Sequence, residues 1–205
     1  MNQFLYDQVI QRIPADSRVL DLGTGDGSFL ERLLQAKQVH GEGVEKDPEM
    51  VARCIERGLI VHQGDILDGL DQYGSATFDY VLLIGTFQEL LSPELVLRES
   101  FRVGRRVILA YMNLAYWRYR FQLMWGGVSP RLEATPLPWY ESPNIQFFSI
   151  VDFREFCHAK NIVIKENAFF NTFGRVRVLP NFRAREALSV LELGGDQHGR
   201  ELHGQ

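Results

Sequence analysis

The stretch Val19-Leu-Asp-Leu-Gly-Thr-Gly-Asp-Gly27 decides the fold. Its first four residues form the apolar end of a short buried strand that carries one acid, Asp21. The glycines at 23, 25 and 27 let the backbone turn sharply and approach a ligand closely. Apolar residues at helical spacing follow from 29 to 34, so the stretch predicts a strand, a glycine loop and a helix.

The same alternation of strands and helices continues outward from this stretch. Strand-like segments lie at 18–22, 39–44, 59–62, 78–84, 106–112, 162–170 and 186–193. Helical patterns lie near 4–10, 29–34, 48–57, 93–101, 115–125 and 152–160. The run at 78–84 is apolar almost throughout, which is typical of a parallel strand covered on both faces. We therefore predict an α/β fold with a doubly wound, mostly parallel seven-stranded sheet and helices on both faces.

Composition excludes several classes of protein. The 205 residues, 45% of them hydrophobic, predict one domain over residues 1–193 and a disordered polar tail over 194–205. A net charge of −4 and a pI near 5.8 argue against nucleic-acid and membrane partners. Two distant cysteines and no Cys/His cluster predict neither a disulfide framework nor a metal site. The start of the chain lacks the pattern of a signal peptide, so we expect a cytoplasmic protein.

The glycine loop has a spacing that favours one kind of ligand. A dinucleotide fingerprint would place its third glycine, or an alanine, at position 28, which is Ser here. Asp21 would be unfavourable beside a pyrophosphate but favourable beside a cationic amino group and a sulfonium. The D-x-G-x-G-x-G arrangement resembles motif I of class I methyltransferases that use S-adenosylmethionine (SAM). A tight turn without a ligand is the alternative.

Two further acids end the next two predicted strands. Glu45 follows the second strand, where an acid can accept hydrogen bonds from both ribose hydroxyls. Asp65 follows the third strand, where the resemblance places an acid near the adenine amino group. Ile66 and Ile84 could enclose the adenine ring, and Lys46 lies beside Glu45. Each acid alone could be a solvated loop residue, but together they predict a site for SAM or S-adenosylhomocysteine at Asp21, Gly23, Gly25, Gly27, Glu45, Lys46, Asp65, Ile66 and Ile84.

Residues 16–193 also resemble a narrower family, the MetW proteins of bacterial methionine biosynthesis. The resemblance rests on RVLDLGTGDGSFL, GVEKDPE, FDYVLLIGTFQEL, VLRESFRVGRRVI, NLAYWRYRFQLMWGG and LPWYESPNIQFFSIVDFREFC. It implies a class I methyltransferase-type (Rossmann-like) fold and an activating or assembling role beside a homoserine O-acyltransferase. Methyl transfer is not firmly part of what the family implies.

The chain departs from the family pattern at three positions. The usual G-C-G loop reads G-T-G at 23–25, and the backbone can absorb this change. Tyr116 and Gln146 stand where relatives carry histidine, the commonest general base. If those histidines were catalytic, this chain should be inactive or work differently. If they were structural, Tyr and Gln can still hydrogen-bond.

The segment 113–148 is rich in aromatic residues and contains four prolines. The aromatic residues are Tyr116, Trp117, Tyr119, Phe121, Trp125, Trp139, Tyr140, Phe147 and Phe148. Loops rarely hold so many aromatic side chains unless they cover something, so we expect this segment to be a cover. Some of its residues could line the acceptor side of a ligand site or hold the cover shut, and packing is the alternative: Tyr116, Trp139, Tyr140, Asn144 and Gln146.

Few residues of the chain are candidates for a catalytic or partner-binding role. Glu89 is the one clear base after the fourth strand, and it could equally cap the helix that starts near Pro93. The stretch 171–185 carries four arginines and no acid. It could be a solvated loop or a docking surface for a protein partner, since arginine is enriched at interfaces.

The sequence leaves three alternative functions. The preferred one is a MetW-like SAM-binding protein that associates with and activates a homoserine O-acyltransferase. The second is a SAM-dependent methyltransferase acting on a small molecule. The third is another nucleotide-binding enzyme, such as one that uses NAD; the absence of a Tyr-x-x-x-Lys pair weakens it.

Overall fold

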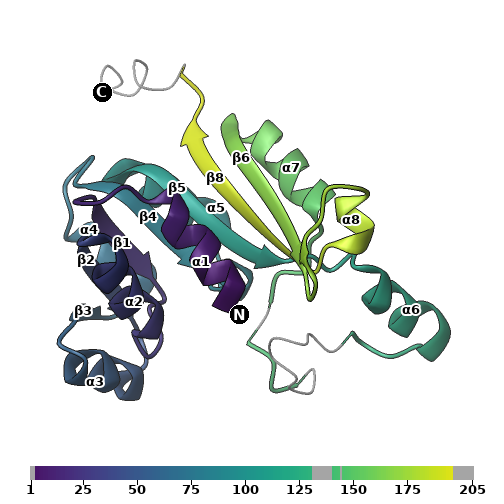
Figure 1. Cartoon of the computed structure of the whole chain (residues 1–205), viewed down its shortest axis with the longest axis horizontal. Coiled ribbons are helices and arrows are strands. Elements are labelled where there is room, and N and C mark those ends of the chain that lie inside the picture. The colour runs from purple at the N-terminus through teal and green to yellow at the C-terminus, as the bar shows by residue number, and fades with distance from the viewer. Residues whose placement is uncertain (1–2, 131–139, 144, 196–205) are drawn as a thin grey trace.

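The computed structural model describes residues 3–130, 140–143 and 145–195. Eight strands form one sheet in the order β3-β2-β1-β4-β5-β8-β6-β7. The strands are β1 (Arg18–Leu22), β2 (His40–Glu45), β3 (Ile60–Gln63), β4 (Phe78–Ile84), β5 (Gly104–Met112), β6 (Ile162–Asn171), β7 (Gly174–Arg175) and β8 (Glu186–Leu193). The first five are parallel, whereas β6, β7 and β8 pair antiparallel. Figure 1 shows the twisted sheet crossing the molecule.

The seven predicted strands are all present, so the doubly wound α/β fold is confirmed. The eighth strand, β7, has two residues that pair with the end of β6. Two residues are too short to carry an alternating pattern, which is why the sequence did not predict it.

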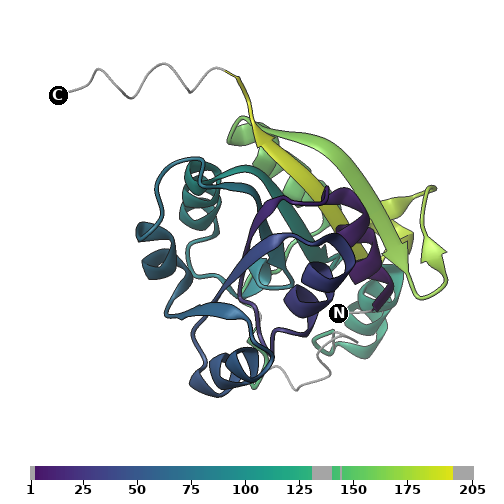
Figure 2. The same ribbon diagram turned by 60° about the vertical axis from the view of Figure 1, so that its left-hand side comes forward.

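Helices cover both faces of the sheet (Figures 1 and 2). They are α1 (Gln3–Arg12), α2 (Ser28–Lys37), α3 (Pro48–Glu56), α4 (Ile66–Asp71), α5 (Pro93–Val103), α6 (Trp117–Gly126), α7 (Ile150–Ala159) and α8 (Pro180–Arg183), with a 3-10 turn, η1 (Phe87–Glu89). One apolar core joins the sheet to α4, α5 and α7, and the other joins it to α1, α2 and α3. Along β4, Val81 and Leu83 enter the first core while Tyr80 and Leu82 enter the second, as two-sided burial requires.

Three short elements appear where no helix was predicted: α4, η1 and α8. Asp65 caps α4 by accepting a hydrogen bond from Leu67 N–H at 3.1 Å. The stretch 171–185 is only partly a solvated loop, because it contains β7 and α8 and because Arg185 is buried.

The first residue of the predicted tail, Gly194, is bonded to the folded domain. Gly194 N–H donates to Asn161 O at 2.9 Å, so this residue belongs to the folded part. The predicted disorder of 196–205 falls outside the described residues.

Candidate functional site

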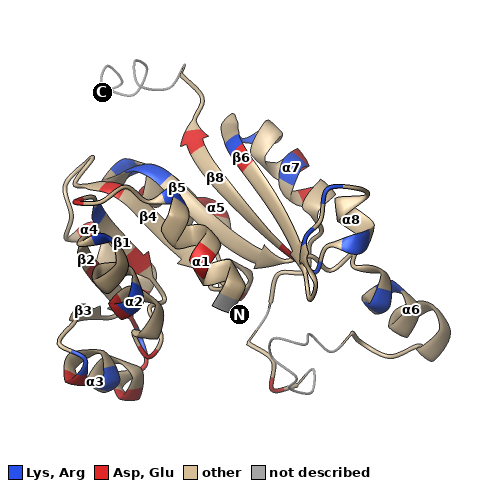
Figure 3. Cartoon of the chain, in the orientation of Figure 1, with Lys and Arg blue, Asp and Glu red and all other residues tan. Residues whose placement is uncertain are grey.

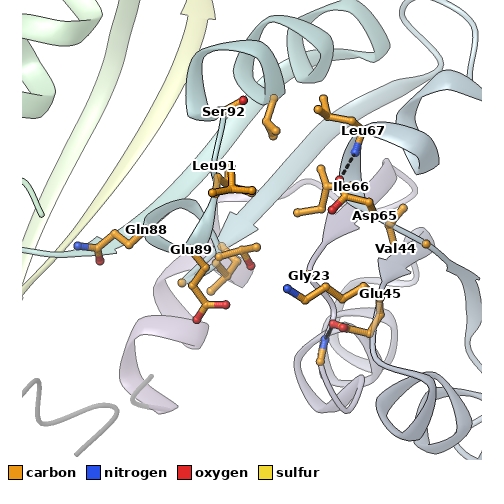
Figure 4. Close-up of a pocket in the computed structure, with 18 of the residues that line it drawn as sticks. Gly23, Val44, Glu45, Asp65, Ile66, Leu67, Gln88, Glu89, Leu91 and Ser92 are labelled. Atoms are coloured by element: carbon orange, nitrogen blue, oxygen red, sulfur yellow. Dashed lines mark hydrogen bonds between the residues drawn. The ribbon is translucent and has the colours of Figure 1, made fainter. Parts of the chain in front are cut away.

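A cavity of about 550 Å³ opens beyond the carboxyl ends of the parallel strands, where the chain order reverses between β1 and β4. Open α/β sheets bind ligands at this switch point, and ligand sites usually measure about 300–1,000 Å³. The cavity brings together eight of the ten predicted site residues: Gly23, Gly25, Glu45, Lys46, Asp65, Ile66, Ile84 and Glu89. Figure 4 shows Glu89 on one side of the cavity and Glu45 with Asp65 on the other.

The glycine loop forms the floor of the cavity. Gly23 and Gly25 have φ of 77° and 59°, a region that side-chain-bearing residues rarely adopt. Gly23 is tightly enclosed, because a Cβ there would lie 2.4 Å from Thr86 Oγ1. A Cβ on Gly25 would meet nothing within 4 Å. Gly23 is therefore required by packing, whereas Gly25 leaves open space for a ligand beside the backbone.

Gly27 is enclosed by neighbouring side chains. It lies at the start of α2, and a Cβ there would be 2.5 Å from Leu59 Cδ1 and 2.9 Å from Cys54 Sγ. It is not among the residues that line the cavity. The third glycine thus allows α2 to pack closely against α3 and against Leu59, the residue before β3.

Asp21, on β1 two residues before Gly23, also lies outside the cavity lining. Its side chain is buried, and burial followed by repulsion from Glu45 raises its pKa to about 7. The hydroxyl of Tyr6 belongs to the same environment, since burial and then Asp21 raise its pKa. A buried acid with this pKa is a favourable neighbour for a ligand cation, which would restore its charged form.

Glu45 is held rigidly at the edge of the cavity. Its Oε2 accepts from Gly25 N–H at 2.8 Å, and its Oε1 accepts from Asp47 N–H at 2.9 Å. Each carboxylate oxygen keeps a second lone pair for a ligand hydroxyl. The sequence predicted a ligand role for Glu45 but not its bond to the glycine loop.

The opposite wall carries Glu89 at the end of η1. Burial and then Glu45 raise the pKa of Glu89, while Lys46 lowers it. Glu89 does not cap α5, because the residue at that position is Ser92. The preceding residue, Gln88, also lines the cavity, and its side-chain amide is bonded to Met112: its Oε1 accepts from Met112 N–H at 2.8 Å and its Nε2 donates to Met112 O at 3.2 Å.

Several lining residues were not predicted. They include Tyr6 from α1 and the apolar residues Leu67, Leu90, Leu91, Val96 and Met112. Tyr6 precedes the glycine loop by 17 residues in an ordinary amphipathic helix, and nothing in its local sequence marks it as a site residue.

The described part of the segment 113–148 does not line the cavity. Figure 1 shows α6 beside α8, beyond the end of β5. Tyr116 is buried and packs with Met112 and Tyr119. Gln146 Nε2 donates to Leu90 O at 3.1 Å, so this segment supports the cavity wall from behind. The roles expected of Trp139 and Asn144 fall outside the described residues.

The described residues contain neither a cluster of metal ligands nor a membrane-spanning helix. No three His, Cys, Asp or Glu side chains lie together as metal ligands would. In the same part of the chain, no helix combines the length and apolar character needed to cross a membrane.

Comparison with known families identifies the chain over almost its whole length. Residues 4–191 match the model of the methionine biosynthesis protein MetW. The chain belongs to the MetW family. The family predicted from the sequence motifs is thus confirmed.

A curated relative supports this membership. The bifunctional methionine biosynthesis protein MetXA/MetW of Rhodopirellula baltica is 32% identical over 184 residues. The match covers 85% of this chain but 30% of the relative, so the MetW chain corresponds to less than a third of that protein.

Solved structures place this MetW protein in the methyltransferase fold. A SAM-dependent methyltransferase from Archaeoglobus fulgidus has a TM-score of 0.67 at 14% identity, with 92% of this chain and 91% of that chain covered. TrmK of M. capricolum, solved with S-adenosylhomocysteine, has a TM-score of 0.58 at 13% identity, with coverage of 94% and 69%. At these identities the likeness shows the fold, which agrees with the predicted class I methyltransferase type.

Proposed function

We propose that this MetW protein binds SAM or S-adenosylhomocysteine in the cavity, and that it associates with and activates a homoserine O-acyltransferase. The observation that carries the ligand assignment is that Gly25 and Glu45 line one cavity at the switch point, with the buried Asp21 close enough to Glu45 for that charge to raise its pKa. A methyltransferase-fold neighbour solved with S-adenosylhomocysteine supports the choice of ligand.

The residues present fit such a ligand. The open space at Gly25 accepts a group close to the backbone, and Glu45 can accept hydrogen bonds from ribose hydroxyls. Ile66 and Ile84 supply apolar surface for a flat ring, with Asp65 near them to accept from an amino group. Asp21, with its pKa near 7, becomes charged when a ligand cation approaches.

The partner assignment rests on the family and on the curated relative. The relative's name joins MetXA and MetW in one protein, as expected if the two act together. Regulation by SAM makes physical sense because SAM is made from methionine, so its level reports the output of the pathway. Such regulation requires the ligand to favour either the free or the associated state, and the coupling is reciprocal.

One observation favours methyl transfer as the second candidate function. Glu89 lines the cavity, and burial raises its pKa toward the range of a general base. SAM, when bound, supplies an electrophilic methyl group, and Glu89 could accept the proton of an acceptor molecule. Tyr116 and Gln146 do not contribute a base, since they pack and hold the wall.

Calorimetry with a matched pair of glycine variants tests the ligand assignment. Gly25 and Gly127 share a φ of 59° with nothing within 4 Å of a new Cβ, but only Gly25 lines the cavity. We expect Gly25→Ala to lose most SAM affinity and Gly127→Ala to keep it. Glu45→Ala should weaken binding by about 1–3 kcal/mol, because hydrogen bonds to a charged group are strong. Tight NAD binding without SAM binding would reject the assignment.

Rate measurements separate the two functions. Purified homoserine O-acyltransferase from the same organism should gain activity when this protein is added, and SAM should change the gain. Methylation of small acids or alcohols that disappears in Glu89→Gln, with SAM affinity kept, would favour the methyltransferase instead.

A further inference from the structure

A second surface of the molecule combines exposed aromatic rings with arginine. On α6, the exposed apolar residues are Trp117, Phe121, Leu123, Met124 and Trp125. The segment 173–183, which includes β7 and α8, adds Phe173, Val178, Leu179 and Phe182. Exposed arginines lie among them at 118, 120, 175, 177 and 183. We call this surface, α6 with 173–183, the arginine–aromatic face.

The two parts of the face are continuous. The guanidinium of Arg120 lies 5.7 Å from the ring centre of Phe182 and so joins α6 to α8. A hollow of about 280 Å³ lies between the β6–β7 turn and α8, and its walls carry Arg175, Arg177 and Arg183 beside Phe173. Figure 3 shows basic residues on α6 and around α8.

The aromatic residues of α6 form a ridge that is ordered before any partner arrives. Trp117, Phe121 and Trp125 follow one another at four-residue spacing. The rings of Phe121 and Trp125 are stacked with centroids 4.4 Å apart, and Trp117 meets Phe121 edge-on at 5.9 Å. Side chains that already hold one another lose little freedom on binding. Large aromatic residues of this kind are typical binding hot spots.

The charge of the face selects its occupant. Neither 113–130 nor 171–185 contains an acid or a lysine, although the whole chain has a net charge of −4. The preference for arginine over lysine, together with aliphatic residues such as Leu123 and Met124, is typical of protein interfaces. Phosphates would gain nothing from those aliphatic side chains. A second copy of the same face would place arginine against arginine, which opposes self-association.

We propose that the arginine–aromatic face docks a protein surface with an apolar groove bordered by acidic side chains. We place that acidic, grooved surface on the homoserine O-acyltransferase, so the identity of the partner rests on the proposed function. The aromatic ridge of α6 fills the groove, and the arginines at 175, 177 and 183 meet the acidic border. The face thus supplies both affinity and electrostatic attraction during encounter.

Binding kinetics with purified full-length acyltransferase test this proposal. The ridge variant Phe121→Ser/Trp125→Ser should weaken association about 100-fold, mainly through faster dissociation. The charge variant Arg175→Glu/Arg177→Glu should slow association about 10-fold and flatten its dependence on salt. Matched controls on distant exposed positions, Ile55→Ser on α3 and Arg98→Glu on α5, should stay within about 2-fold of the native protein.

The outcomes separate the two proposals. If the native protein does not bind the acyltransferase, the partner assignment and the docking inference both fail. If it binds and both face variants bind as tightly, the docking inference alone fails. Binding of bulk transfer RNA, or dimerisation of the native chain, that disappears in the face variants would assign the face to that other occupant and overturn the inference. Circular dichroism and SAM calorimetry should show each variant folded and still able to bind the ligand.

Discussion

The cavity and the arginine–aromatic face differ in residue type and in how firmly their residues are held. Around the cavity, residues are held by packing and hydrogen bonds. Gly23 packs tightly against Thr86, and the Glu45 carboxylate accepts a hydrogen bond from Gly25 N–H. On the face, α6 buries only Tyr119 among its ten residues, whereas the eleven-residue α5 buries Val96, Leu97, Ser100, Phe101 and Val103. Burial explains α5 as part of the core. It does not explain the apolar residues of α6, and exposed apolar groupings of this kind mark interaction sites.

Two neighbouring residues on β5 and just after it connect these regions. Met112 lines the cavity, and both its backbone groups are bonded to Gln88. Asn113 is fully buried, and its Nδ2 donates to Ala184 O at 2.8 Å and to Asn181 O at 3.1 Å, at the base of α8. Its Oδ1 accepts from Ile150 N–H at 3.3 Å. Met112 in the cavity wall is thus joined to α8 on the face through one residue, Asn113. A displacement of Met112 would therefore be passed to α8.

The largest difference between the regions should appear in Gly23→Ala. A new Cβ would lie 2.4 Å from Thr86 Oγ1, and that hydroxyl is held by its hydrogen bond to Leu22 O. Backbone strain and overpacking together should lower the free energy of unfolding by about 2–5 kcal/mol. Gly127→Ala, at the end of α6, carries the strain without the clash and should cost about 1–2 kcal/mol. Equal losses in urea unfolding would contradict the packing role given to Gly23.

The second prediction concerns pH. Asp21 has a folded-state pKa near 7 and an ordinary value of 3.8, so the folded state binds more protons than the unfolded state between these values. The free energy of unfolding should therefore fall as pH rises from about 4 to 7, by up to about 4 kcal/mol. Above pH 7 the contribution is constant.

Asp21→Asn isolates this effect. The variant should be more stable than the native protein at pH 8, and the difference between the two should shrink as pH falls toward 4. A ligand cation should reverse the preference, so SAM affinity should rise with pH up to about 7 in the native protein and less in the variant. If the two proteins show the same pH dependence, Asp21 does not titrate in this range.

Fold and site differ in how far they could be predicted from the sequence. The strands and most helices carry patterns that extend over four or more residues, and their core-facing apolar residues indicate them directly. Short elements without such patterns, such as α8 and β7, form because the long strands β6 and β8 fix their ends. The sequence therefore predicted seven strands and left the details of 171–185 open.

Within the site, strand-end residues could be predicted and residues from elsewhere could not. Glu45 and Ile84 end strands and Asp65 follows one, so parallel pairing brings them to one edge. Tyr6 reaches the cavity because α1 packs against α2 and β6, where Tyr6 meets Phe29 and Phe4 meets Phe170, and these contacts have no local sequence signal. The spacing of Gly27 predicts a ligand role, and its surroundings add a packing role that the spacing could not indicate, because Leu59 and Cys54 leave no room for a Cβ. Likewise, an aromatic segment can mark a cover or an exposed face, and composition alone does not separate the two.

The third prediction breaks the link between cavity and face. Gln88→Leu keeps the volume of the side chain but leaves the buried N–H and C=O of Met112 without their partner. The free energy of unfolding should fall by about 2 kcal/mol, because unsatisfied buried polar groups are costly. Hydrogen exchange should rise at Met112 and Asn113. Gln146→Leu removes one hydrogen bond to a half-buried carbonyl and should cost about 1 kcal/mol or less. Unchanged exchange at Asn113 in Gln88→Leu would show that the two regions are independent.

The smallest effect on stability should come from the face itself. Phe173 is 98% exposed, so its ring contributes almost no burial to the folded chain. Phe173→Ser should change the free energy of unfolding by less than about 0.5 kcal/mol, although loss of a buried phenylalanine ring usually costs several times more. Phe153→Ser supplies the contrast, since Phe153 is 2% exposed and packs against Tyr111 with ring centroids 4.7 Å apart. That variant should lose about 3–5 kcal/mol. A large loss in Phe173→Ser would show that its ring is buried in solution, and the surface available for docking would then be smaller than the structure indicates.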